Sequence, residues 1–161
     1  MAVDFILELE GVPGECQKQG YEGKIDIDSW SGSAHRSGAF AIGGGGTTGA
    51  ASISDIGVSK HFDKASCPLQ LCVVTGKHIP SGKIYCRKSV GDKQDVYLQI
   101  DLTDIVVTSY SAGGAGGSDM IHENATFNFA KIEIKYKEQA LDGSLADAGE
   151  LKFDVPKGET F

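Results

Sequence analysis

Runs of alternating apolar residues that change phase part-way constrain the fold of this chain most strongly. Such runs occupy residues 24–33, 53–62, 95–109 and 126–137. Side chains alternate across a β-strand with a period of two, so a run changes phase only through an extra residue or a bend. Long strands bent in this way suit a small closed barrel. The sequence therefore predicts a mainly β fold, a bulged antiparallel β-barrel of two sheets. The alternative is that some runs are two short strands joined by a turn.

One stretch departs from the alternation and favours a single flanking α-helix over about Ser66–Thr75. Asp63 or Ser66 offers an oxygen for the free N–H groups of its first turn, and Pro68 is tolerated there. Gly76 can adopt the left-handed conformation that ends a helix. The stretch is apolar on nearly every side, so we expect burial on more than one face, against the β layer, another subunit or both.

Glycine is unusually abundant, with 22 residues against 4 prolines. A cluster at 43–49 has too few side chains to build a core, so we expect a glycine-rich arm over about 35–49. After Tyr136 the chain becomes polar, which predicts a C-terminal tail over about 138–161. We expect that tail to be loop-like as far as Glu150, with a short edge strand over 151–155. The length is that of one domain over 1–161.

Composition excludes several partners. A net charge of −7 and a pI near 5.0 argue against nucleic acid and against an anionic membrane surface. The sequence has no apolar run of about 18 residues, so we expect no membrane insertion. The first ten residues carry Asp4, Glu8 and Glu10 and do not resemble a secretory signal peptide. We therefore expect a protein that is made in the cytoplasm and that leaves it, if at all, without a cleaved leader.

The search for catalytic and cofactor motifs finds none of the usual patterns. Four cysteines lack Cys-x-x-Cys spacing, which favours reduced thiols, three of them partly buried. The histidines are spread along the chain without metal-ligand spacing. His61 with Asp63, or His122 with Glu123, can be written as an acid–base pair, but such neighbours are more commonly solvated loop residues. We expect no enzyme, no cofactor and no metal.

Several segments in order along the chain resemble the Hcp family, the haemolysin-coregulated tube proteins of bacterial type VI secretion. They are Met1–Leu7, Gly43–Gly49 before Ile53–Ile56, His61–Ser66, Thr75–Pro80 and Glu123–Ile132. Within them, the residues of the family-motif helix region are Asp63, Lys64, Ser66, Gly76, Lys77, His78 and Pro80. The sequence departs from the family pattern where Cys67 separates Ser66 from proline, and where Lys152-Phe153-Asp154 replaces the usual Gly-Trp-Asp.

The resemblance implies a β-barrel whose copies close into six-membered rings. These rings stack into a tube that a contractile sheath expels, behind a spike, with effectors carried in the lumen, and the tube protein itself is secreted without a signal peptide. We expect the arm to contact a neighbouring subunit or ring through His35, Gly43, Gly44, Gly45, Gly46, Thr47, Thr48 and Gly49. Trp30 and Ser31 are our candidates for a lumen-facing effector site, although core packing is the more common role for a tryptophan. The competing interpretation is a monomeric barrel that binds a small ligand.

Overall fold

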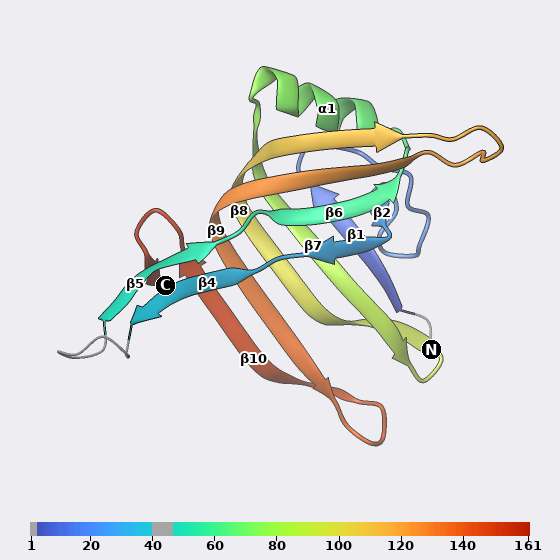
Figure 1. Ribbon diagram of the computed structural model, residues 1–161. Helices are drawn as coiled ribbons and strands as arrows, with labels where there is room; N and C mark the ends of the chain where they lie inside the picture. The colour runs from blue at the N-terminus through green and yellow to red at the C-terminus, as the bar shows by residue number, and fades with distance from the viewer. Residues whose placement is uncertain (1–2, 40–46) are drawn as a thin grey trace.

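The computed structural model describes residues 3–39 and 47–161, which form one α-helix and a set of antiparallel strands (Figure 1). In chain order the elements are β1 (Val3–Leu9), β2 (Ile25–Ile27), β3 (Ser29–Ser31), β4 (Ala34–Ala39), β5 (Thr47–Ile53), β6 (Ile56–His61), α1 (Ser66–Thr75), β7 (His78–Val90), β8 (Lys93–Gly113), β9 (His122–Gln139), β10 (Leu145–Asp154) and β11 (Glu159–Thr160). The predicted mainly β fold with two sheets is confirmed.

The paired strands of the larger sheet form a ring, in which each strand is joined to the next. β1 pairs with β2 and β7, β7 with β8, β8 with β9, β9 with β6, and β6 with β3. The last step from β3 back to β2 is covalent, because one residue, Asp28, separates them. The Asp28 backbone N–H donates to the Ser59 carbonyl at 2.7 Å and so bridges this break. β10 and β11 extend the sheet outward from β9.

The two longest strands bend together, which explains two of the predicted phase changes. Asp104 in β8 has a left-handed backbone with φ of 54°. The β8–β9 register places Asp104 opposite Ala130, the point at which the inward face of β9 passes from Phe129 to Ile132. A bulge follows in β8 at Thr108. β8 and β9 therefore contribute to both layers of the barrel, and Figure 1 shows that both strands bend along their length.

The core lies between these layers and is almost entirely aliphatic and aromatic. Its fully buried members include Leu7, Ile25, Leu69, Ile84, Ile105 and Phe127. These residues come from six different elements, so the core forms only when the barrel closes. Burial raises the pKa of the core thiol Cys86 to about 11. Each of the four cysteines is free, and three of them are buried, as the sequence predicts.

The other two phase changes have a different cause from the one we expect. The run 24–33 divides at Asp28 into β2 and β3, and the run 53–62 divides at residues 54–55 into β5 and β6. The alternative interpretation, two short strands joined by a turn, is thus correct for these runs. In both cases the break allows the chain to leave one strand pairing and enter another.

α1 packs on β8 and matches its predicted bounds. Gly76 ends the helix with φ of 69°, as predicted, whereas the N-cap is Ala65, so the expected capping by Asp63 or Ser66 is wrong. Asp63 instead accepts a hydrogen bond from the Ala65 N–H at 2.9 Å. In the single chain one face of α1 is buried, and Leu71 remains exposed on another, so the expected burial on more than one face would require another subunit. This ten-residue element, the helix of the described chain, is too short to cross a bilayer.

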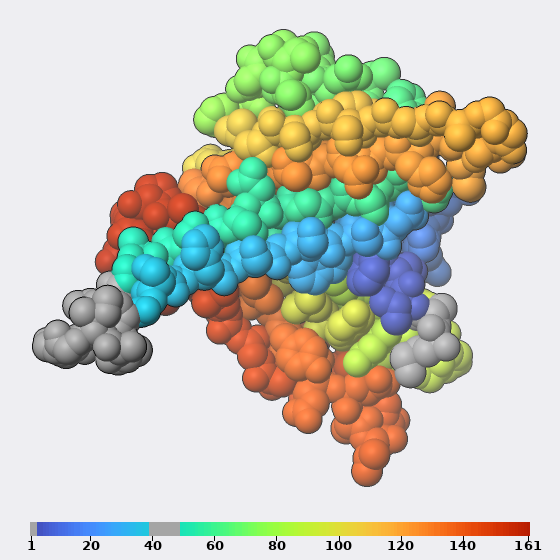
Figure 2. All heavy atoms as spheres, viewed as in Figure 1, coloured from blue at the N-terminus to red at the C-terminus, as the bar shows by residue number. Residues whose placement is uncertain are grey.

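The arm and the tail contain more strand than the sequence indicates. β4 and β5 form a separate two-stranded sheet that extends away from the barrel (Figure 1, Figure 2). Residues 40–46 of the predicted arm lie outside the described residues. The expectation of a loop as far as Glu150 is wrong, because β10 begins at Leu145 and pairs with β9. Most of β10 is exposed on both faces, so its sequence lacks the alternation that would have revealed it.

Candidate functional site

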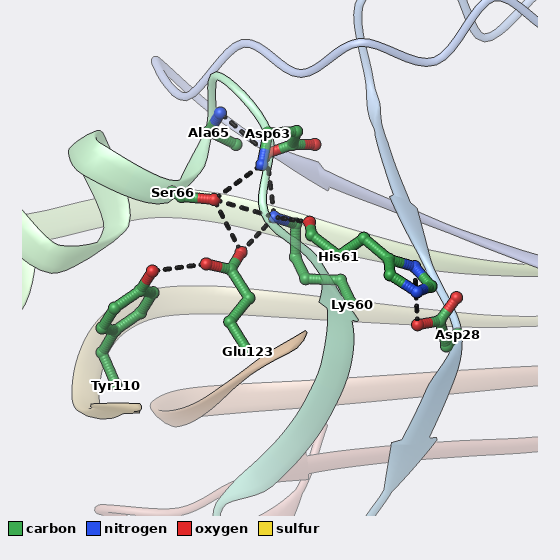
Figure 3. A network of polar contacts seen from close by, with 8 residues as sticks. All are labelled: Asp28, Lys60, His61, Asp63, Ala65, Ser66, Tyr110 and Glu123. Carbon is green, nitrogen blue, oxygen red and sulfur yellow. Dashed lines mark hydrogen bonds and ion pairs between the residues drawn. The ribbon is translucent and has the colours of Figure 1, made fainter. Parts of the chain in front are cut away.

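The register of β6 on β9 places a buried lysine opposite a buried glutamate (Figure 3). Lys60 pairs with Glu123 across these strands, and each side chain is only 1% exposed. Lys60 follows Ile56 and Val58 on the inward parity of β6. A charged group at such a position is stable only when other polar groups surround it.

That requirement is met by a closed network at the start of α1. The Lys60 ammonium contacts the Glu123 carboxylate and donates to Asp63 Oδ1 at 2.8 Å. Ser66, the first residue of α1, donates from Oγ to Glu123 Oε1 at 2.8 Å. Tyr110 donates its hydroxyl proton to Glu123 Oε2. The network thus joins β6, β8, β9 and the beginning of α1.

The electrostatics of the network favour a structural role. Burial raises the pKa of Tyr110, and its hydrogen bond to Glu123 and that residue's charge raise it further, so the phenol stays protonated and remains a donor. Among the described residues, every buried side-chain nitrogen and oxygen has a partner. The buried polar groups of the network therefore satisfy one another, and together they hold the start of α1 against the barrel.

The next pair along the same ladder faces outward and consists of two histidines. His61 pairs with His122, and their rings lie with centroids 4.7 Å apart. His61 Nδ1 also lies 3.1 Å from Asp28 Oδ2 (Figure 3). The two acid–base pairs that the sequence allows, His61 with Asp63 and His122 with Glu123, do not form. Adjacent residues of a strand, such as His122 and Glu123, point to opposite faces.

Comparison of the sequence with known proteins identifies the family to which this chain belongs. The model of the Hcp family, described as a type VI secretion system effector, matches residues 6–136. The chain belongs to the Hcp family. It is 37% identical over 153 residues to the protein hcp1 of Pseudomonas aeruginosa, covering 95% of this chain and 94% of that protein.

Solved structures agree with this assignment. A structure described as a type six secretion system protein superposes with a TM-score of 0.92 at 25% identity, covering 99% of this chain and 100% of the other. Hcp1 from Salmonella typhimurium has the same fold, with a TM-score of 0.77 at 22% identity and complete coverage of both chains, 100% of each.

Five of the family-motif residues of this Hcp chain fall into two groups. Asp63 and Ser66 belong to the buried network, whereas Lys64 next to them is exposed. Lys77, His78 and Pro80 line a groove beside α1, together with Glu10, Gly11, Val12, Pro68, Leu71, Cys72 and Ile79. The first group holds the helix in place, and the second lies on a surface that another molecule can reach.

The other predicted site residues lie at the base of the projecting hairpin and along it. Trp30 is half-buried and packs against the core. Ser31, at the end of β3, is exposed and pairs with Gly57 of β6. His35 lies on β4, and residues 47–49 begin β5. The structure thus places Trp30 and Ser31 beside each other, and the described arm residues, His35 and 47–49, on a separate hairpin.

The buried network has a signal in the sequence that a search for catalytic motifs does not capture. Ile56, Val58 and Lys60 share one parity, as do Glu123, Ala125 and Phe127. A lysine and a glutamate that each continue an inward-facing apolar pattern predict a buried ion pair, provided that the two strands are known to be neighbours. Tyr110 gives no comparable local signal, because the bulge at Thr108 puts it out of phase with the buried residues Ile105 and Val107.

Proposed function

We propose that this chain is a structural subunit of the type VI secretion inner tube. Six copies close into a ring, rings stack into the tube, and the tube carries effectors in its lumen inside the contractile sheath and behind the spike. The subunit is made in the cytoplasm and is then secreted without a cleaved signal peptide. The observation that carries this proposal is the β4–β5 hairpin of an Hcp-family chain, which projects from the barrel as its own two-stranded sheet.

A projecting hairpin of this kind needs a partner. An isolated two-stranded sheet is marginally stable in water. Residues 34–38 of β4 are all exposed, so the barrel of the same chain does not cover this part of the strand. A neighbouring copy can supply the missing surface, and a head-to-tail contact that closes on itself gives a ring. We expect the backbone of the arm to approach the neighbouring copy most closely at a small set of residues. Our candidates are His35, the glycines at 43–46, Thr47, Thr48 and Gly49.

The outer face of α1 offers a second contact surface. Cys67, Leu71 and Val74 follow the spacing of one helix face, and all three are exposed, with Leu71 at 57% and Val74 at 73%. The groove lined by Lys77, His78 and Pro80 lies beside it. Because each subunit has a net charge of −7, contacts between rings require local charge complementarity and depend on salt.

The size of the purified assembly tests the proposal. We expect light scattering after size-exclusion chromatography to give six times the 17.0 kDa of one chain, and negative-stain images to show rings. A particle of 17.0 kDa at high protein concentration would contradict it and would favour the monomeric ligand-binding barrel.

We assign the lumen-facing effector site to Ser31, with Trp30 beside it. Because Ser31 is exposed at a strand end, Ser31→Gln is expected to leave the ring intact and to lower effector retention by steric exclusion. Co-expression with an effector of the same system, followed by measurement of the effector bound per ring, checks this. Ser118→Gln, in the exposed loop between β8 and β9, is the matched control for a serine-to-glutamine change. Equal retention by both variants would place the site elsewhere.

A further inference from the structure

The outward histidine pair and the neighbouring aspartate form a cluster that the proposed tube function does not use. We propose that Asp28, His61 and His122 bind a divalent transition-metal ion. One possible ligand atom from each residue lies within 4.8 Å of the others. The three residues come from separate segments, the β2–β3 junction, the end of β6 and the start of β9, which the fold brings together.

The chemistry of the donors selects the class of ion. Two imidazoles and one carboxylate match the usual ligands of zinc, and imidazole also suits nickel and copper. Calcium and magnesium prefer sites built from oxygen ligands, so they are disfavoured here. Three protein ligands leave a position for water in a tetrahedral site. Metal–ligand bonds of about 2.0–2.2 Å require the donor atoms to move closer together than their present separations of up to 4.8 Å. The exposed side chains of Asp28 and His122 have room to rotate.

The backbone positions of the three ligands are fixed by other contacts. His61 and His122 are direct partners in an antiparallel ladder, so their separation is set by the sheet. The adjacent Lys60–Glu123 pair secures the same ladder from the inside. Asp28 is fixed by its backbone hydrogen bond to Ser59, and its carboxylate already lies 3.1 Å from His61 Nδ1. A bound ion would therefore order mainly the side chains, which lowers the entropic cost of binding.

The location gives the ion a stabilising role. The barrel closes between β2 and β3 through Asp28 rather than through a continuous ladder. An ion on Asp28, His61 and His122 would join this junction to β6 and β9. A ligand that binds the folded state alone raises the melting temperature, and the rise increases with its concentration relative to its dissociation constant.

Zinc titration of the full-length chain without a histidine tag tests the site. We expect one zinc per chain by competition with a chromophoric chelator. His61→Gln and His122→Gln are each expected to weaken zinc binding by about 10–100-fold or more, since loss of even an outer-shell partner costs that much. His78→Gln removes an exposed histidine outside the cluster and serves as the matched control. Circular dichroism of each variant checks that it is folded.

Two further measurements distinguish specific zinc binding at Asp28, His61 and His122 from nonspecific binding elsewhere on the surface. One equivalent of zinc should shift the imidazole NMR signals of His61 and His122 and leave those of His35 and His78 unchanged. Zinc at about 100 times its dissociation constant should raise the melting temperature of the native chain by about 5–10 °C, and Asp28→Asn should reduce this rise. Equal affinity of the native chain and the His61→Gln variant, or equal perturbation of all four imidazoles, would overturn the proposal.

Discussion

Replacing Lys60 with methionine is expected to lower the free energy of unfolding by about 3–5 kcal/mol, because the change leaves Glu123 buried without its cation. Asp63 loses the same partner and with it one restraint on the turn before α1. Urea unfolding at a fixed protein concentration, followed by circular dichroism, measures the loss. A fixed concentration matters because assembly contributes to the apparent stability.

Two variants make the Lys60 result specific. Lys64→Met changes an exposed lysine next to the same turn, and surface changes of this kind usually stay within about 0.5 kcal/mol. Combining Lys60→Met with Glu123→Leu should recover part of the loss, since replacing a whole buried ion pair by apolar groups is often neutral. A loss below about 1 kcal/mol for Lys60→Met alone would mean that the network does not hold α1 to the barrel.

Shortening the β4–β5 hairpin is expected to convert the assembled protein into free subunits of 17.0 kDa. Arg36 pairs with Ala51 in register, so an Asn-Gly turn can join them directly and remove residues 37–50. Of the described residues, none of those removed belongs to the barrel core, which should remain folded. Light scattering measures the mass, and circular dichroism checks the fold.

The matched control shortens a different glycine-rich hairpin in the same way. Gly113 pairs with His122 at the ends of β8 and β9, so an Asn-Gly turn can replace residues 114–121. We expect this variant to keep the ring mass. If the β4–β5 variant also kept it, the hairpin would not be the contact that closes the ring. If both variants became monomeric, the effect would not be specific to that hairpin.

The parts of the fold that the sequence predicts are those with local patterns. The helix bounds follow from a break in alternation and from Gly76, whose lack of a side chain permits the left-handed end. The bend in β8 follows from the phase change around Asp104, where the strand must turn to keep its apolar residues in the core. By contrast, β10 is held mainly by backbone pairing to β9, which no side-chain pattern reports.

The candidate sites are harder to predict because they depend on register between distant strands. His61 and His122 are far apart in the sequence, and only the pairing of β6 with β9 places their rings together. The same holds for Asp28, which reaches them from the break between β2 and β3. Family resemblance supplies the ring and tube hypothesis, but it indicates neither the buried network nor the histidine cluster.

On β6 and β9 a buried charged pair is followed by an outward-facing histidine pair, and this order determines how the two strands align. If either strand turned over by one residue, Lys60 or Glu123 would face solvent and a histidine would occupy the interior in its place. The remaining charge would then be buried without its counter-ion, which strongly destabilises that alignment. The observed alignment is thus the more stable of the two.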